Sequence, residues 1–387
     1  MKNIILVSLD TVRADVAYSG KFPGINNIRK QGVTFLNTVS SSPLTPISHA
    51  TVFTGQQPFN HGIRHLFRES LNSSSATFTE VLKQNGYSTG AIVSCPGMNK
   101  WYGFCRGFDH YDDEIPRLPD GSDALKTVDV KLRGRAMKRA DLVVDRAKDW
   151  VEKNKDKNFF LFLHFFDAHW PYEAPSKFAG DNAYEEEIGY SDHYLNDFFQ
   201  YLKENKLFDD SLIICFSDHG EDLNGLYPND KGGEKLGHPE EFGHGCLLYE
   251  QTQKVLFIVH DPQLPQGVDI DHQVRLVDLA PTLLDILAIK SDSITFDGQS
   301  LLPIILNKTK PQLTAYCETY YPEEQTKATG GKFAEAKNKI AYCVDNRFKT
   351  IQHIDSDTLE VYDLINDKLE KNNLAIKQDF INKKNAK

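Results

Sequence analysis

Three short segments, 4–9, 159–166 and 212–216, most constrain the fold of this chain, because each is almost wholly apolar. Strands with apolar side chains on both faces are typical of buried parallel sheets. Between these segments, 140–152 and 185–207 carry apolar residues at helical spacing. This alternation predicts an α/β fold, a three-layer sandwich with a mainly parallel central sheet.

The length of the chain, 387 residues, exceeds the usual size of a single core, so we expect a large domain and a smaller appendage. Segment 254–260 indicates one more strand, and 277–289 indicates a helix. Further along, short segments are typical of antiparallel strands, at 314–320, 339–344, 348–353 and 359–364. A tail helix is expected from about Asp367. We therefore predict a large domain at 1–310 and a small C-terminal α+β subdomain at 311–387, packed on it.

The overall charge argues against two classes of partner. Lys and Arg total 44 and Asp and Glu total 54, and a net charge of −10 disfavours broad binding to nucleic acid or anionic membranes. No apolar run is long enough to span a membrane, and the N-terminal run is too short for a signal peptide. The six cysteines have no CxxC spacing, which indicates reduced thiols and a cytoplasmic location.

Polar side chains follow each of the three predicted central strands. Asp10 follows the first strand, Asp167 and His169 follow the second, and Asp218 and His219 follow the third. The carboxyl ends of parallel strands meet at one edge of a sheet, where α/β proteins bind their ligands. Asp10, Asp218 and His219 offer the oxygen and imidazole donors that a divalent cation needs. Caps or loop contacts could account for any one of these acids, but less readily for the whole set.

A helix start contributes a hydroxyl to the same edge. Thr45 suits the N-cap, Pro46 the first helical position and Gly55 the end of the helix. The start of a helix also attracts anions such as phosphate or sulfate. Thr45 alone could act only as a cap; beside a bound cation, its hydroxyl would become a nucleophile at neutral pH.

Two loop histidines extend the candidate site. His169 and His244 could protonate a leaving oxygen, hold substrate oxygens, or bind a second metal together with Asp167. The plainer alternative for each is a solvated loop histidine. His164 lies inside a strand run, and we expect it to be a core residue.

Taken together, these motifs resemble the sulfatase-like branch of the alkaline phosphatase superfamily, over most of the chain. Each motif is modest alone, but their order and spacing make the resemblance strong. The motifs are SLDTVRAD (8–15), TPISH (45–49), TG (54–55), DAHWPY (167–172), SDHGE (217–221), GHG (243–245), LYE (248–250) and VDLAPT (277–282).

The resemblance implies that Asp10, Thr45, Asp218 and His219 bind the metal, with Thr45 as the nucleophile. Its substrate-binding roles carry over to His169 and His244, which we predict to be catalytic. We predict that His49 and Asp167 also bind substrate.

The chain departs from the sulfatase pattern at four positions. Strict sulfatases have Cys or Ser as the nucleophile, matured to formylglycine, where this chain has Thr45. His49 replaces the family's arginine, Thr11 replaces a second aspartate, and His219 stands where many sulfatases have asparagine. Threonine cannot be matured by that route. The chain therefore looks more like the phosphodiesterase, phosphonate hydrolase and phosphoethanolamine or glycerophosphate transferase relatives.

The leading hypothesis is a metal-dependent hydrolase or transferase of phosphorus esters, acting on a phosphodiester or phosphonate monoester through a covalent Thr45 intermediate. One alternative is a sulfuric ester hydrolase without formylglycine, and another is a non-catalytic binding protein with the same fold. We expect one divalent metal site, with Mn²⁺ or Zn²⁺ favoured and a second site left open. The expected partner is a small phosphate, phosphonate or sulfate ester, and a homo-oligomer is left open.

Overall fold

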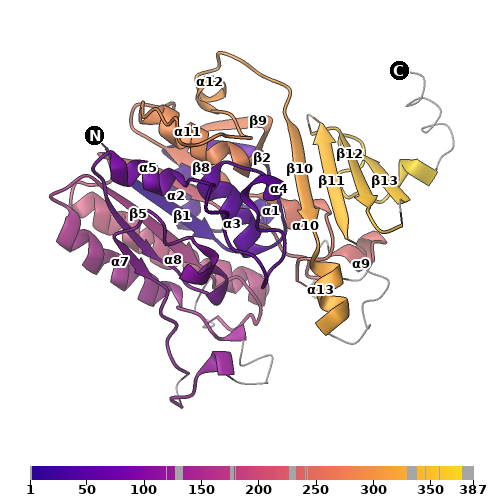
Figure 1. Ribbon diagram of the computed structural model, residues 1–387, viewed down its shortest axis with the longest axis horizontal. Coiled ribbons are helices and arrows are strands. Elements are labelled where there is room, and N and C mark those ends of the chain that lie inside the picture. The colour runs from indigo at the N-terminus through magenta and orange to yellow at the C-terminus, as the bar shows by residue number, and fades with distance from the viewer. Residues whose placement is uncertain are drawn as a thin grey trace.

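The computed structural model describes residues 2–118, 120–126, 134–174, 178, 180–225, 232–239, 241, 243–328, 338–344, 346–356 and 358–376. Within these ranges a large sheet occupies the middle of the main body, with helices on both sides of it (Figure 1). Its nine strands are β1 (Asn3–Leu9), β2 (Val33–Val39), β3 (Ser88–Ile92), β4 (His110–Asp112), β5 (Phe159–Phe165), β6 (Ser211–Phe216), β7 (Lys254–Val255), β8 (Phe257–His260) and β9 (Val268–Arg275).

The strand order of this sheet is β4-β3-β5-β1-β6-β8-β2-β7, and β9 pairs with β2. The pairs along the run β4-β3-β5-β1-β6 are all parallel, as is β2 with β9. The pairs that β8 makes with β6 and β2, and that β7 makes with β2, are antiparallel. The sheet is therefore mainly parallel, as predicted, with β1 between β5 and β6 near its middle.

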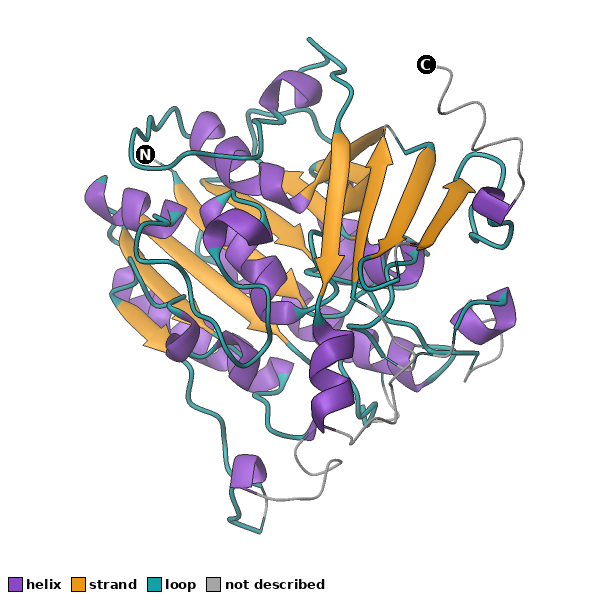
Figure 2. Ribbon diagram, turned by 45° about the vertical axis from the view of Figure 1, so that its right-hand side comes forward, coloured by secondary structure: helices purple, strands orange, loops and turns teal. Residues whose placement is uncertain are grey.

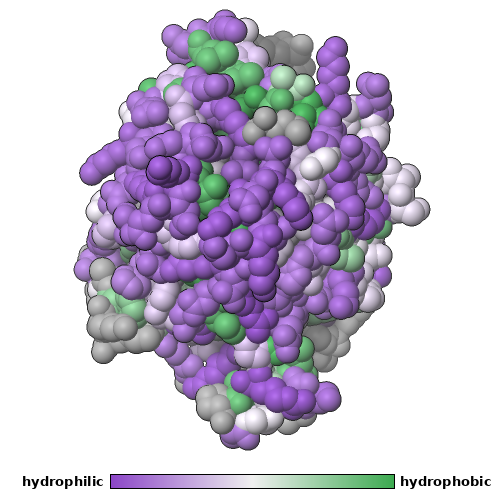
Figure 3. Space-filling model, turned by 90° about the vertical axis from the view of Figure 1, so that its left-hand side faces the viewer, coloured by the Kyte–Doolittle hydropathy of each residue, from purple (hydrophilic) through white to green (hydrophobic). Residues whose placement is uncertain are grey.

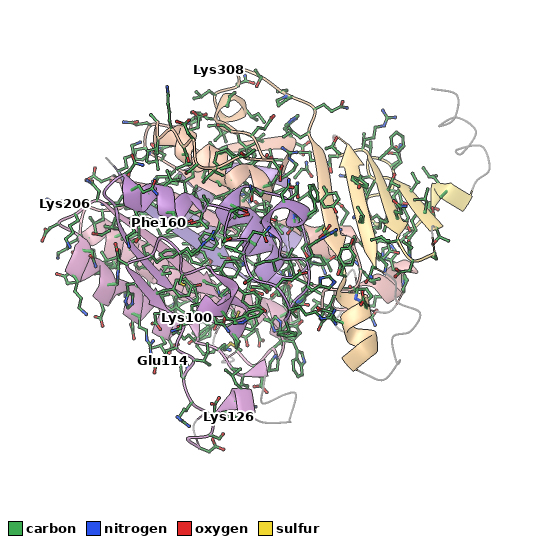
Figure 4. All side chains as sticks on the ribbon, viewed as in Figure 1. Lys100, Glu114, Lys126, Phe160, Lys206 and Lys308 are labelled. Carbon is green, nitrogen blue, oxygen red and sulfur yellow. The ribbon has the colours of Figure 1, made fainter. Side chains whose placement is uncertain are left out.

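Alternation along β1 divides the core into two layers, because successive side chains of a strand point to opposite faces. Ile4 and Leu6 pack with α3 (Thr45–Thr54), α5 (Phe78–Gln84) and α11 (Leu279–Ile286). Ile5 and Val7 pack with α2 (Pro23–Lys30), α7 (Ala140–Asn154) and α8 (Ala183–Glu204). Phe160 lies in the first of these layers, deep inside the body, while the labelled Lys206 and Lys308 lie at its margins (Figure 4). The three-layer sandwich is confirmed.

The remaining helices are short and lie mostly in connections between strands. They are α1 (Ala14–Ala17), α4 (Pro58–His61), α9 (Gly233–Leu236), α10 (Glu250–Gln253), α12 (Leu302–Ile305) and α13 (Tyr321–Ala328).

A second, antiparallel sheet follows in the chain. Its strands are β10 (Thr314–Thr319), β11 (Lys339–Val344), β12 (Phe348–His353) and β13 (Thr358–Asp363), paired in that order. Figure 2 shows it as a separate layer beside the main body. One apolar cluster joins the two, since Ala315, Cys317 and Ile351 pack with Leu247 and Leu248. The small C-terminal sheet is therefore present as predicted, and the boundary near residue 310 stays a prediction.

The strand predicted at 254–260 and the predicted tail helix differ from the structure. The strand predicted at 254–260 is divided into β7 and β8, because the Ser217 hydroxyl accepts the Leu256 backbone N–H at 2.8 Å and takes it out of the ladder. The predicted tail helix is wrong where the structure describes it: residues 367–376 form turns and one 3₁₀ turn, Leu374–Ile376.

The surface and the cysteines add two observations. The face shown in Figure 3 is largely hydrophilic, with small separate hydrophobic patches. No helix in the described part of the chain combines the length and apolar character needed to cross a bilayer. All six cysteines lie in described segments and carry free thiols.

Candidate active site

The candidate site lies at the carboxyl edge of the large sheet. Asp10 directly follows β1, and Asp218 comes just after β6, the parallel neighbour of β1. Parallel neighbours end at the same edge, so the two carboxylates meet there. Thr11 has a φ of 59°, which is uncommon for a residue with a side chain and occurs often at functional sites. Its backbone N–H donates to Asp218 Oδ1 at 3.2 Å, which ties the end of β1 to Asp218.

The hydroxyl of Thr45 lies at the same edge, on the first residue of α3. The predicted cap is therefore wrong: Leu44, which has no polar side chain, is the N-cap. The Thr45 hydroxyl instead donates to Asp10 Oδ2 at 3.0 Å and lies 3.3 Å from His219 Nε2. The predicted end of the helix is confirmed, since Gly55 has a φ of 64°. The start of α3 gathers backbone N–H groups and partial positive charge, which favours an anion beside Thr45.

Asp10, Asp218 and His219 fit a divalent cation. One ligand atom from each lies within 4.8 Å of the others. Asp10 Oδ1 and Asp218 Oδ2 are buried, and neither has a hydrogen-bond partner among the described residues. Buried oxygens without a partner are costly, and carboxylate oxygens with imidazole nitrogen are suitable ligands for Mn²⁺ or Zn²⁺. The donor set thus fits the expected cation, whose identity stays a prediction.

Hydrogen-bond partners assign the tautomer of His219. Its Nδ1 lies 3.0 Å from the Gly220 carbonyl, which can only accept, so Nδ1 carries the proton. Nε2 then has a free lone pair on the side of Thr45. A metal-binding histidine is oriented in this way, with its other ring nitrogen donating to a carbonyl or carboxylate.

His164 has the opposite tautomer. The Ser94 backbone N–H donates to its Nδ1 at 3.3 Å, so Nε2 carries the proton and donates to Asp10 Oδ2 at 3.1 Å. His164 is buried, as a core residue should be, but its strand position gave no sign that it would orient Asp10. Asp10, Cys95 and His164 also lie close enough to hold a metal. The lone pair of His164 is already used by Ser94, which disfavours a second metal there.

Burial sets the charge state around the candidate ligands. It raises the pKa of Asp10 and, together with repulsion from Asp10, that of Asp218. Burial lowers the pKa of His164 to about 4 and that of His49 to about 3, so both imidazoles are neutral near pH 7. A cation between the two carboxylates would relieve their repulsion.

His49 lies one helical turn after Thr45 in α3, at the position where the resemblance places an arginine. It is fully buried, its Nδ1–H donates to the Thr45 carbonyl at 2.8 Å, and its Nε2 accepts from the Ser8 hydroxyl at 2.9 Å. Its Nδ1 is also 3.6 Å from Asp218 Oδ2. Both ring nitrogens therefore meet protein groups. These contacts favour a role for His49 in positioning Thr45 over the predicted contact with substrate.

The two loop histidines lie next to the candidate metal ligands. The His244 ring centroid is 4.2 Å from that of His219 and 5.1 Å from that of His169. His169 stacks on Phe166, and its Nδ1–H donates to the Trp170 carbonyl at 2.7 Å, which leaves Nε2 for a ligand. Burial lowers the pKa of both loop histidines. The structure thus brings His169 and His244 together as the motifs indicated.

Asp167 lies two residues before His169, in the loop after β5. It is fully buried, and its Oδ1 accepts the Ala140 backbone N–H at 3.1 Å and lies 3.1 Å from the Arg139 guanidinium. Burial raises its pKa to about 7, although Arg139 lowers it. Arg139 also pairs with Glu187 at 2.8 Å. These contacts favour a role for Asp167 in holding the loop that carries His169.

One buried acid of the site was missed by sequence reasoning. Glu221 is fully buried, and its Oε1 lies 3.1 Å from His244 Nδ1. Its place in the SDHGE motif was the only available signal, and that motif does not show which side chain Glu221 faces.

Known proteins resemble this chain over most of its length. The family model described as "Sulfatase" matches residues 2–289, and that of "N-sulphoglucosamine sulphohydrolase, C-terminal" matches residues 242–385. Arylsulfatase K of Xenopus laevis is 21% identical, over 91% of this chain and 74% of that protein. Arylsulfatase K of Homo sapiens is 20% identical, over 97% of this chain and 79% of that protein. The chain covers 63% of the Rattus norvegicus protein of the same name.

Solved structures share the fold. The phosphonate monoester hydrolase of Agrobacterium radiobacter has a TM-score of 0.76 at 18% identity, covering 98% of this chain and 93% of that one. A protein solved with its substrate D-glucosamine-2-N,6-O-disulfate has a TM-score of 0.76 at 19% identity, covering 100% and 95%. The fold is thus that of the sulfatases and phosphonate hydrolases of the alkaline phosphatase superfamily. Because the family model spans residues 2–289 of 387, the chain belongs to the sulfatase family.

Proposed function

We propose that this protein is a metal-dependent hydrolase of phosphorus esters, a phosphodiester or phosphonate monoester, that forms a covalent intermediate on Thr45. The observation that carries the proposal is the position of the Thr45 hydroxyl, 3.0 Å from Asp10 Oδ2 and 3.3 Å from His219 Nε2. Asp10, Asp218 and His219 would hold the cation. When bound, the cation lowers the pKa of a neighbouring hydroxyl and offsets charge on the ester oxygens.

The reaction steps follow from the chain's own groups. Thr45 gives up its hydroxyl proton to a neighbouring imidazole Nε2 or to water, and its oxygen forms a bond to phosphorus, while the backbone N–H groups at the start of α3 attract the anionic oxygens. The bond to the leaving oxygen breaks with its electron pair, and that oxygen takes a proton from His169 or His244, whose Nε2 has first accepted one. Water then attacks the phosphothreonine and restores Thr45. An acceptor alcohol in place of water would make the protein a transferase.

The chemistry of threonine supports phosphorus over sulfur. Formylglycine is an aldehyde formed from the CH₂ group of Cys or Ser, whereas Cβ of threonine carries a methyl group and the same oxidation would give a ketone. A formylglycine hydrate can expel sulfate, while an ordinary sulfated threonine has no such route.

Sulfuric ester hydrolysis is the second candidate. The family model and the arylsulfatase names of the relatives favour it. Bis-nitrophenyl phosphate, a nitrophenyl phosphonate and nitrophenyl sulfate should therefore be assayed in parallel with Mn²⁺ and with Zn²⁺. Faster turnover of the phosphorus esters is expected, and a preference for the sulfate would overturn the proposal. A metal-free protein that stays inactive after either metal is added would instead support a non-catalytic binding protein.

Thr45→Ala tests the nucleophile. Turnover should fall by at least about 10³-fold, because the attacking oxygen is lost. Metal binding, measured by calorimetry with the metal alone, should persist, since both carboxylates and His219 remain. Thr45→Ser keeps the hydroxyl and should keep measurable turnover. Unchanged turnover in the alanine variant would exclude Thr45 as the nucleophile.

A further inference from the structure

Glu221 is a buried acid that the proposed reaction leaves without a task. It is fully buried. Oε1 faces His244 Nδ1 at 3.1 Å, and Tyr172 also interacts with this carboxyl group. Burying a carboxyl group costs free energy, because the group loses its hydration without full replacement. A chain that keeps such a group therefore indicates a function for it.

The backbone fixes Glu221 beside His244. Asp222 and Gly243 form an antiparallel bridge, in which each backbone N–H donates to the other residue's carbonyl at 2.7 Å. This pairing places the preceding residue, Glu221, beside the following one, His244. Gly243 and Gly245 have φ values of 95° and 115°, in the left-handed region that favours glycine. A Cβ at Gly245 would also lie 2.5 Å from the Tyr321 ring, so this close approach requires glycine.

The ring of His244 lies close to two other imidazoles. Its centroid lies 4.2 Å from that of His219 and 5.1 Å from that of His169. Its Nε2 makes no hydrogen bond to any residue that the structure describes, whereas Nδ1 faces Glu221. A hydrogen bond at one ring nitrogen decides which nitrogen is left for a ligand.

We infer that Glu221 is a positioning residue, which holds the imidazole of His244 with Nε2 available to the ester oxygens. The inference rests on the proposed function only in that His244 must contact the ester during turnover. It does not depend on whether that ester contains phosphorus or sulfur.

The test is a set of double-mutant cycles on whichever ester the wild-type protein hydrolyses. Glu221→Leu should lower kcat/KM by roughly 10–100-fold, the usual cost of losing a partner that orients an active-site group. In a His244→Ala background the same change should have almost no further effect. In a His169→Ala background it should keep its full effect. Glu221→Gln retains a hydrogen-bonding side chain and should restore most of the activity.

Asp222→Asn is the matched control, since Asp222 is an adjacent buried acid that accepts from the Gly233 and Asn224 backbone instead of from a histidine. Asp222→Asn should change kcat/KM by the same factor in the wild-type, His244→Ala and His169→Ala backgrounds. The inference would be overturned if Glu221→Leu lowered kcat/KM by the same factor in every background. It would also be overturned if Glu221→Leu left the kcat/KM of the otherwise wild-type protein unchanged. If Glu221→Leu lowers the Tm strongly, Glu221→Met replaces it in the double-mutant cycles. Failure of the proposed function is seen separately, as wild-type protein that prefers sulfate or is inactive.

Discussion

His164 controls the orientation of a candidate cation ligand through one hydrogen bond. Its Nε2–H donates to Asp10 Oδ2 at 3.1 Å, and Asp10 Oδ1 is left without a partner among the described residues. The ring is neutral near pH 7 because burial lowers its pKa to about 4. Asp10 therefore offers one defined oxygen to the cation.

Loss of the His164 donor should weaken metal binding. His164→Leu is expected to lower the affinity for Mn²⁺ by about 10–100-fold, since Asp10 Oδ2 would keep only the Thr45 hydroxyl as a donor and would be held less firmly. His164→Gln can place an N–H near the position of Nε2 and should recover most of the affinity. Calorimetric titration with Mn²⁺ alone measures both. His61→Leu is the control, because His61 is equally buried but its Nε2 faces Thr51; an unchanged affinity in His164→Leu would contradict the prediction.

Sequence reasoning found the residues whose placement follows from local pattern. Asp10 and Asp218 come just after predicted strands, so the meeting of their carboxylates follows from parallel strand order. The helix start at Thr45 was also predicted, but its place beside them does not follow from that order. Glu221 and His164 were missed as functional side chains. Their contacts depend on the Asp222–Gly243 pairing and on a neighbouring Ser94 N–H, which are non-local and leave no periodic signal.

At the scale of elements, a side chain of α8 caps the N-terminus of α2. Phe22, the N-cap of α2, has no polar side chain. Asp192, in the middle of α8, takes its place: its two oxygens accept the Gly24 and Ile25 backbone N–H groups at 2.8 and 2.7 Å. The α2–α8 contact thus includes a cap that no local sequence signal could show.

The cap should make stability depend on pH. Burial raises the pKa of Asp192 from 3.8 to about 6, although the two N–H groups lower it. Between these values the folded protein holds a proton that the unfolded chain has lost, so the free energy of unfolding falls as pH rises. Asp192→Asn removes this titration. The stability difference between wild type and variant should therefore shrink from pH 4.5 to pH 7 in urea unfolding, and a constant difference would contradict the assignment.

The C-terminal strands were the most predictable elements, whereas β2, β3, β4 and β9 of the large sheet were not predicted. All four C-terminal strands lie within one residue of their predicted bounds, because their alternation is local. The helix predicted at 277–289 is shorter, since Leu276–Asp278 forms a 3₁₀ turn before α11. Asp278 is bound there by the Arg275 side chain at 2.6 Å, a contact that periodicity cannot show.

At the scale of the whole molecule, a buried lysine joins the two sheets. Lys349 of β12 is almost fully buried and pairs with Glu250 of the main body at 3.0 Å and with Glu370 at 2.8 Å. The two acids hold the pKa of Lys349 above its ordinary value against the effect of burial. The C-terminal sheet is thus attached by charge as well as by its apolar cluster.

Lys349→Met should be strongly destabilising, because it leaves two buried carboxylates without their cation. A loss of about 3–5 kcal/mol in the free energy of unfolding is expected. Glu250→Gln with Glu370→Gln in the same variant should recover much of that loss. Lys148→Met is the control, since Lys148 pairs with Asp197 at the surface and should cost less than about 1 kcal/mol. Equal losses in the two lysine variants, measured by urea unfolding, would contradict the prediction.

The central place of β1 has a consequence for the order of events during synthesis. β1 is made first, yet its partners β5 and β6 begin at Phe159 and Ser211. At about 5–20 residues per second, an apolar strand waits on the order of ten seconds or more before either neighbour leaves the ribosome. During that time the nascent chain exposes Ile4 to Val7, which are wholly buried later. A chaperone that binds short apolar segments is therefore expected to hold the beginning of this chain until the sheet can close around it.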